Sequence, residues 1–265
     1  MKFTVFTPTF NRKHTLQRVY ESLCTQSLKD FEWLIVDDGS DDGTRDLVDR
    51  WVLDNKITIK YHYQTNKGKP SALNKGIALA KGDLFACLDS DDAIVPNALS
   101  RLWEAWLTVV DNGDVKTITC MCMSQNSVVI NDPKISNLTI VNPIDMFFFQ
   151  PGERWGCHAL DALKEFTFPI FAGEKFIPEG AVWLSFADRY DAVWVNEALR
   201  VYYDSEDSLS SSVRTLRRSN PKGYLFHYAT VLNLAPTFVS KMNALVKLTI
   251  FILLQFVWKR DSKRS

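Results

Sequence analysis

The sequence predicts an α/β fold, in which a doubly wound, mostly parallel sheet is followed by a C-terminal helical extension. Two observations support this fold class. Between residues 3 and 88, short apolar runs alternate with stretches that have apolar residues at helical spacing, which is the pattern of βαβ units. In addition, three of the predicted strands end in polar clusters, at the edge where open α/β sheets bind ligands.

The predicted elements follow from these patterns in chain order. Near-continuous apolar runs predict buried strands at 3–7, 31–36, 57–63 and 84–88. Helical periodicity predicts helices between them at 13–26, 44–53 and 71–80. The second half is expected to contain helices at 96–110, 142–149 and 179–189, and β segments at 117–123, 127–131, 192–195 and 199–203. A Ser-rich segment at 205–220 is predicted to be a mobile linker before helices at 222–234 and 237–258.

Composition limits the classes of function. The chain has 265 residues, 46% hydrophobic content and a formal net charge of +0, which suits a globular protein and gives no electrostatic argument for nucleic acid. Five cysteines, with no signal peptide before them, predict reduced thiols and a cytoplasmic protein. The charge is uneven, because the residues from Val213 onward contain ten Lys or Arg and a single acid, Asp261.

The three polar clusters at the strand ends are the candidate site. They are Thr7-Pro8-Thr9-Phe10-Asn11-Arg12, Asp37-Asp38-Gly39-Ser40 and Asp89-Ser90-Asp91-Asp92. Three carboxylates within four residues repel one another unless a cation lies between them, and Mg²⁺ or Mn²⁺ prefers such oxygen ligands together with phosphates. The alternative is an acidic turn in which Asp92 caps the following helix.

Four motifs together resemble the family 2 inverting glycosyltransferases, which have the GT-A fold. They are the first cluster with Phe6, the stretch from Val36 to Thr44, Asn66-Lys67-Gly68 with Ala72-Leu73-Asn74-Lys75-Gly76, and Ala80-Lys81-Gly82-Asp83 leading to the Asp89 cluster. The resemblance covers residues 1 to about 110 in the right order and spacing. It implies a nucleotide-sugar-binding half at 1–110, an acceptor and catalytic-base half at 111–204, and an appended segment at 205–265.

The resemblance implies roles for individual residues. Asp38 would contact the uracil ring, and the turn containing Thr7, Pro8 and Phe10, with Arg12 nearby, would border the nucleoside. Asp89 and Asp91 would bind the ribose and a Mn²⁺ or Mg²⁺ ion on the diphosphate, with Asp92 as a further candidate ligand. Lys69 would either meet a phosphate or be a solvated loop lysine.

The expected catalytic base lies in the second half of the chain. In the family, this base belongs to a Glu-Asp pair at a helix start, and the corresponding residues here are Glu179 and Gly180. Glu179 is therefore the candidate base, although Gly180 departs from the pattern. Glu174 and Asp188 are the alternative bases. Glu179 could also be an acid in the first turn of a helix that is favoured by the helix dipole and has no catalytic role.

The implied function is metal-dependent, inverting transfer of one sugar from a nucleotide sugar, UDP-linked by expectation, to a glycan or lipid-linked acceptor in surface polysaccharide assembly. Processive relatives carry a Gln-x-x-Arg-Trp motif after the base and long membrane spans, whereas Arg154-Trp155 precedes Glu179 here and no long span is expected. A pyrophosphorylase is disfavoured because its Gly-rich loop is missing after the first strand. A non-catalytic nucleotide-sugar or glycan-binding protein is the remaining alternative.

The basic tail permits two interpretations. The apolar run 248–258 is too short to span a bilayer, and Lys241, Lys247, Lys259, Arg260, Lys263 and Arg264 surround it. A helix of this kind fits a peripheral contact through 237–264 with anionic lipid, on the inner face of the plasma membrane. The alternative is a terminal helix packed on the catalytic domain.

Overall fold

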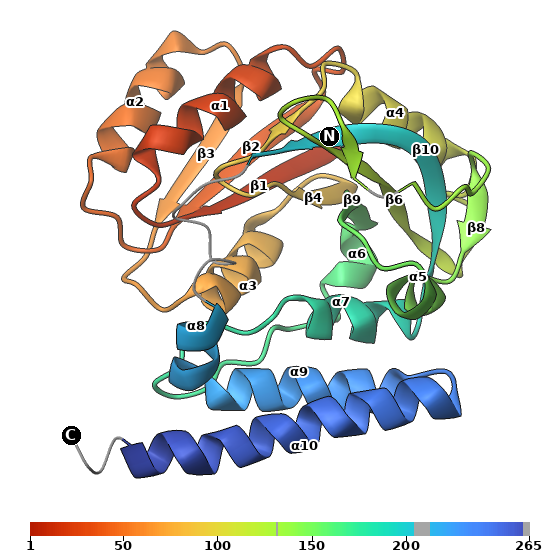
Figure 1. The fold of residues 1–265 in the computed structure, drawn as a ribbon. Coiled ribbons are helices and arrows are strands. Elements are labelled where there is room, and N and C mark those ends of the chain that lie inside the picture. The colour runs from red at the N-terminus through yellow and green to blue at the C-terminus, as the bar shows by residue number, and fades with distance from the viewer. Residues whose placement is uncertain (131, 204–212, 262–265) are drawn as a thin grey trace.

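The computed structural model describes residues 1–130, 132–203 and 213–261. Its centre is a ten-stranded mixed sheet, whose main path has the order β3-β2-β1-β4-β9-β6-β10-β5. Helices cover both faces of the sheet, with α1, α2 and α4 on one face and α3, α6 and α7 on the other (Figure 1). The α/β class and the doubly wound arrangement predicted from the sequence are confirmed.

The first half of the chain forms a parallel sheet with crossover helices. Its elements are β1 (Phe3–Thr9), α1 (Lys13–Cys24), β2 (Phe31–Asp37), α2 (Thr44–Asp54), β3 (Thr58–Tyr63), α3 (Lys69–Leu79) and β4 (Leu84–Cys87). β1 pairs in parallel with both β2 and β4, and β2 pairs in parallel with β3. Each predicted strand and helix of this half is present, because each is encoded by a local apolar run or periodicity.

Two apolar cores fix this sheet between its helices. On the face of α1 and α2, the rings of Tyr20 and Trp51 stack with centroids 4.5 Å apart, and Trp33 lies beside them. On the other face, Phe6 stacks on Phe85 under α3. Because β1 is buried along its whole length, its carboxyl end is held rigidly where the polar clusters emerge.

The second half departs from a parallel arrangement. It contains β5 (Ala93–Ile94), α4 (Ala98–Leu107), β6 (Val115–Ser124), β7 (Val129–Ile130), β8 (Thr139–Val141), α5 (Pro143–Phe149), β9 (Arg154–Ala159), α6 (Leu160–Leu163), α7 (Gly180–Ala187) and β10 (Asp191–Tyr202). β9 lies antiparallel between β4 and β6. The sequence analysis missed β5, β8, β9 and α6. It divided β10 into two strands because Asn196 and Glu197 interrupt the apolar pattern, at the position where the register with β6 is irregular.

The C-terminal segment is helical and packs on the domain. It contains α8 (Val213–Ser219), α9 (Pro221–Leu234) and α10 (Phe238–Asp261). The prediction of a mobile linker at 205–220 is therefore wrong for residues 213–219, which form a helix. Residues 204–212 lie outside the described part of the chain. In Figure 1, α9 and α10 form an antiparallel hairpin beyond α7, on the side of the molecule away from α1 and α2.

α10 closely matches the helix that the sequence analysis expected at 237–258. It has 24 residues. The 18-residue stretch Phe238–Gln255 within it has a mean hydropathy of 1.4, and 11% of this stretch is buried in the protein. By length and composition alone, this helix could cross a membrane. The run 248–258 by itself is short for a span, but the stretch that meets the length criterion begins earlier, at Phe238, and includes Lys241 and Lys247.

Candidate functional site

A cavity of about 600 Å³ lies at the carboxyl ends of the parallel strands. Most residues of the predicted donor site line it, namely Pro8, Phe10, Arg12, Asp38, Lys69, Asp89, Asp91 and Asp92. Thr7 does not: its side chain is buried, and its hydroxyl accepts a hydrogen bond of 3.0 Å from Trp33 Nε1 in the core. The strand ends therefore converge on one cavity, as parallel pairing requires. We call it the donor cavity.

Asp38 is buried at the inner end of the donor cavity and orders the loop beside it. Its Oδ1 accepts hydrogen bonds from Gln64 Nε2 (2.7 Å) and from the backbone N–H of Lys67 (2.8 Å), and its Oδ2 accepts one from the N–H of Gly68 (2.7 Å). These three donors satisfy a carboxylate that would otherwise be costly to bury. Asp38 thus fixes the loop that leads into α3 and Lys69.

Gly68 allows this loop to approach the segment before α7. It has a φ of +91°, and a Cβ added there would lie 2.0 Å from the carbonyl oxygen of Lys175. Only glycine combines this conformation with such a close contact. Two segments more than a hundred residues apart are thereby brought together, and one carries Lys69 whereas the other leads to Glu179.

Lys69 connects the two key carboxylates. Its Nζ lies 2.7 Å from Asp89 Oδ1 and 2.6 Å from Glu179 Oε1. Burial disfavours the charged amine, but Asp89 and Glu179 raise the pKa of Lys69 well above its ordinary value, while Lys69 in turn lowers the pKa of Asp89. The structure therefore brings together the predicted phosphate-facing lysine, the first Asp of the Asp-x-Asp motif and the candidate base.

Asp92 differs from the other two carboxylates of its cluster. It is buried, and its Oδ2 lies 3.5 Å from Nη1 of Arg200 on β10, whose Nη2 contacts Glu153 Oε1 at 2.5 Å. Burial raises the pKa of Asp92 to about 7, and Arg200 opposes that rise. This carboxyl faces the arginine and is poorly placed to bind a metal ion.

Asp89 and Asp91 provide the chemistry of a metal site. Both line the donor cavity, and the Asp89 side chain is 40% exposed. Within the described part of the chain, no three His, Cys, Asp or Glu side chains converge on one metal position. One or two carboxylates nevertheless fit Mg²⁺ or Mn²⁺ that completes its shell with water and substrate phosphates. The donor set is thus compatible with a metal–diphosphate.

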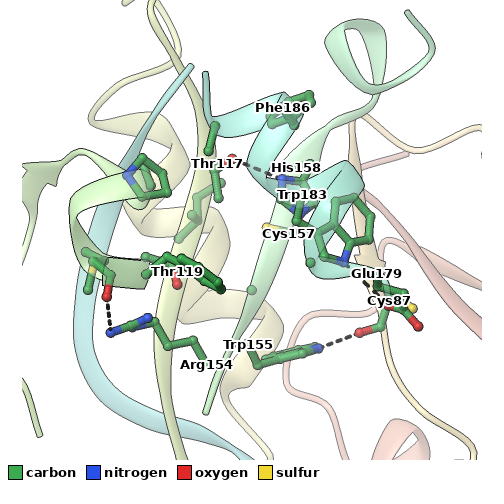
Figure 2. Close-up of a pocket in the computed structure, with 18 of the residues that line it drawn as sticks. Cys87, Thr117, Thr119, Arg154, Trp155, Cys157, His158, Glu179, Trp183 and Phe186 are labelled. Carbon is green, nitrogen blue, oxygen red and sulfur yellow. Dashed lines mark hydrogen bonds between the residues drawn. The ribbon is translucent and has the colours of Figure 1, made fainter. Parts of the chain in front are cut away.

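A second cavity, of about 470 Å³, also has Glu179 in its lining (Figure 2). It is lined largely by aromatic and apolar side chains from α5, β9 and α7, including Phe147, Trp155, Trp183 and Phe186. Trp155 Nε1 donates to the carbonyl of Cys87 at 2.7 Å, and Trp183 Nε1 donates to Glu179 Oε2 at 3.4 Å. We call it the aromatic cavity.

Four charged residues line both cavities. They are Asp89, Glu153, Glu179 and Arg200. The two cavities therefore meet where Lys69 joins Asp89 to Glu179. A molecule in each cavity would have its reactive end at these carboxylates, which is the arrangement that a transfer between two substrates needs.

Acidification is expected to destabilise the protein between about pH 6.5 and pH 4, in part through His158 in the aromatic cavity. This imidazole stacks on Trp183 with centroids 4.7 Å apart, and burial lowers its pKa to about 4. The unfolded chain binds more protons in this range, so the stability contributed above pH 6.5 is lost as the pH falls. His158→Gln is expected to remove on the order of 1 kcal/mol of that loss.

Urea unfolding at about pH 7 and about pH 4.5 measures this difference. Glutamine is chosen because it retains a partner for the Thr117 hydroxyl, which lies 3.0 Å from His158 Nδ1. His14→Gln, at an exposed position of α1, is the matched control. An equal loss of stability in wild type and His158→Gln would contradict the expectation.

The alternative bases lie elsewhere. Glu174 accepts hydrogen bonds from the backbone N–H groups of Lys222 (2.9 Å) and Gly223 (2.8 Å), so it caps the first turn of α9. Asp188 is exposed and follows the last residue of α7, whereas Glu179 precedes its first residue. Of the three acids, Glu179 is the one that lines both cavities.

Sequence reasoning did not assign several polar residues that line the donor cavity, among them Asn66, Glu153 and Arg200. Thr9 Oγ1, Asn66 Oδ1 and Arg200 Nε are buried and have no hydrogen-bond partner among the residues that the structure describes. Asn66 belongs to a recognised motif, which could have indicated it. Glu153 and Arg200 are flanked by sequence that carries no comparable signal.

The fold is that of GT-A glycosyltransferases. S. aureus TarS in complex with UDP superposes with a TM-score of 0.69 at 19% identity, covering 94% of this chain and 71% of that chain. The mannosyltransferase PcManGT from Pyrobaculum calidifontis in complex with GDP-Man and Mn²⁺ has a TM-score of 0.61 at 18% identity, covering 93% and 69%. These two likenesses show that the chain has the GT-A fold.

The sequence comparison points to one family. Residues 4–120 match the family described as Glycosyl transferase family 2, and this match supports a family 2 glycosyltransferase. GalNAc(5)-diNAcBac-PP-undecaprenol beta-1,3-glucosyltransferase from Campylobacter jejuni is 35% identical over 105 residues, which are 39% of this chain and 34% of the relative. The match thus spans about a third of the relative's length.

Proposed function

We propose that this protein is a metal-dependent, inverting glycosyltransferase that moves one sugar from a nucleotide sugar to a hydroxyl of a glycan or lipid-linked acceptor. The observation that carries the proposal is the meeting of two cavities at Glu179 and Asp89, joined by Lys69. UDP is the expected nucleotide, as in the TarS complex. Surface polysaccharide assembly is the expected process, because the Campylobacter relative is named as acting on an undecaprenol-linked glycan.

The donor would occupy the cavity at the strand ends. Asp38 and Asn66, which line this cavity, would bind the base and the ribose. Asn66 Oδ1 and Thr9 Oγ1, which have no partner among the described residues, would each accept a hydrogen bond from the nucleoside. Asp89 and Asp91 would hold a divalent ion, which neutralises the diphosphate and stabilises it as a leaving group. Lys69, at the first position of α3, would exchange its ion pairs with Asp89 and Glu179 for ion pairs with the phosphates.

The acceptor would occupy the aromatic cavity. Its rings offer faces on which a sugar or an apolar carrier can pack, and Glu179 forms the boundary toward the donor. Glu179 would accept the proton of the attacking hydroxyl as that oxygen bonds to the anomeric carbon. The bond from this carbon to the β-phosphate oxygen breaks on the opposite side, so the nucleoside diphosphate leaves and the configuration inverts.

The ion pairs of Lys69 suggest that the donor binds before the acceptor reacts. While Lys69 pairs with Glu179, its ammonium group occupies Oε1 of the carboxylate that would receive the acceptor's proton. A bound diphosphate competes for the same amine through its greater negative charge. Donor binding would therefore prepare the base before the acceptor reacts.

Calorimetric titration of UDP, GDP, CDP and dTDP, each with Mn²⁺ and with EDTA, is the test of the proposed function. We expect one nucleotide, UDP, to bind at least about tenfold more tightly with the metal, because the ion links the diphosphate to Asp89 and Asp91. Absence of binding by all four nucleotides would contradict the proposal. Binding without transfer to any hydroxyl acceptor would instead favour a non-catalytic nucleotide-sugar-binding protein.

A further inference from the structure

The outward side of α10 is apolar along most of its length. Successive helical residues turn by about 100°, so Ala244, Phe251 and Trp258, seven residues apart, form one stripe, and this stripe is buried. Exposed apolar side chains occupy the opposite side, which we call the outer face of α10: Val239, Met242, Val246, Ile250 and Leu253. A helix packed on a water-facing domain would normally carry polar residues there.

Positive charge borders this outer face. Lys241 and Lys247 are exposed and fall on the two flanks of the helix, between the buried stripe and the outer face. The residues from Val213 onward contain ten Lys or Arg and one acid. An apolar face bordered by lysines is complementary to a surface that is apolar inside and negatively charged at its rim.

The arrangement fits a helix that lies on a bilayer better than one that crosses it. Lys247 is near the middle of the 24-residue helix, so a spanning orientation would bring its charge toward the bilayer centre. One side of α10 is also occupied, since Phe251 packs on Tyr228 and Tyr224 of α9 with ring centroids 5.2 and 5.9 Å apart. The outer face is therefore the side of α10 that can contact lipid. With the helix lying on the bilayer, the flanking Lys241 and Lys247 would reach the lipid headgroups.

A second copy of this chain fits the face less well. In a two-fold dimer, the same surface of both copies would meet, and the basic flanks of one α10 would face those of the other. Like charges that are brought together at an interface oppose association. Charge complementarity therefore favours an anionic surface over a second copy of this chain as the partner of the outer face.

We propose that the outer face of α10 docks on an anionic lipid bilayer, with the helix lying in the plane of the interface. The docked hairpin also forms part of the donor cavity, because Tyr224 of α9 lines it. Asn220 Oδ1, just before α9, accepts hydrogen bonds from the N–H groups of Lys175 (2.9 Å) and Phe176 (3.0 Å), in the segment that leads to Glu179. The active site would consequently lie close to the membrane, which suits a lipid-linked acceptor; this consequence rests on the proposed function.

Co-sedimentation of the full chain with vesicles tests the docking. We expect binding to vesicles of phosphatidylcholine with about a third phosphatidylglycerol, and little binding to phosphatidylcholine alone. Val246→Glu with Leu253→Glu is expected to weaken partitioning about tenfold or more, since two carboxylates would enter the apolar interface. Lys241→Gln with Lys247→Gln is expected to weaken binding to anionic vesicles roughly 30-fold, at about fivefold for each base.

Leu53→Glu on α2 is the matched control, because Leu53 is 83% exposed and α2 lies on the other side of the molecule (Figure 1). Equal binding of wild type and Val246→Glu/Leu253→Glu to anionic vesicles would overturn the proposal. So would lipid-free dimerisation that these two substitutions abolish, or retention in the bilayer after alkaline carbonate washing. UDP binding measured on the same variants without lipid separates failure of this proposal from failure of the proposed transferase function.

Discussion

Glu179→Gln is expected to reduce sugar transfer by about a thousandfold while leaving metal-dependent binding of the nucleotide within a few-fold of wild type. Glutamine keeps the size of the side chain and can still contact Trp183, whose Nε1 donates to Glu179 Oε2. It cannot accept the proton of the attacking hydroxyl, so the loss should appear in kcat. Single-turnover transfer to a hydroxyl acceptor and calorimetry of UDP with Mn²⁺ measure the two effects separately.

Asp188→Asn is the control for this prediction, because Asp188 follows the other end of the same helix and is exposed. It should retain near-normal transfer. Full activity of Glu179→Gln would show that the base lies elsewhere. Loss of nucleotide binding together with transfer would instead indicate that the ion pair between Lys69 and Glu179 holds the donor cavity in shape.

Asp91→Asn is expected to lower the affinity for UDP in the presence of Mn²⁺ by about a hundredfold, and to lower transfer at least as much. The substitution keeps the shape of the side chain at the donor cavity but removes the charge that attracts the ion. Binding in EDTA should change little, since the proposed nucleoside contacts are made by Asp38 and Asn66 and not by Asp91. The metal dependence itself is the measured quantity.

Asp83→Asn is the control, because Asp83 is exposed and precedes β4 at the end opposite to the cavity. Its substitution should leave both affinities unchanged. Undiminished metal-dependent binding by Asp91→Asn would contradict the assignment of the Asp-x-Asp motif. Asp92 is expected to behave differently from Asp91, because it is buried against Arg200, and its loss would leave that arginine with one fewer acidic partner.

The sequence by itself determined the fold of the first half and most of the donor cavity. Strands β1 to β4 and their helices are encoded locally, by apolar runs and by the 3.6-residue period, so they were predicted without tertiary information. Once those strands are parallel, Asp38 and Asp89 must emerge at the same edge. Thr7 is the exception, because its hydroxyl satisfies Trp33 in the core.

Long-range packing decided the rest. β9 was not recognised because half of its side chains are incompletely buried and its polar residues face the cavities. The contact of Lys69 with Glu179 spans the two halves of the chain and depends on the close approach at Gly68, which no local pattern encodes. The helix of α10 was predicted from the sequence at 237–258, whereas the side that it buries was decided by the packing of Phe251 against α9. Local periodicity thus fixed which elements form, and the burial of distant side chains against one another decided which charges meet.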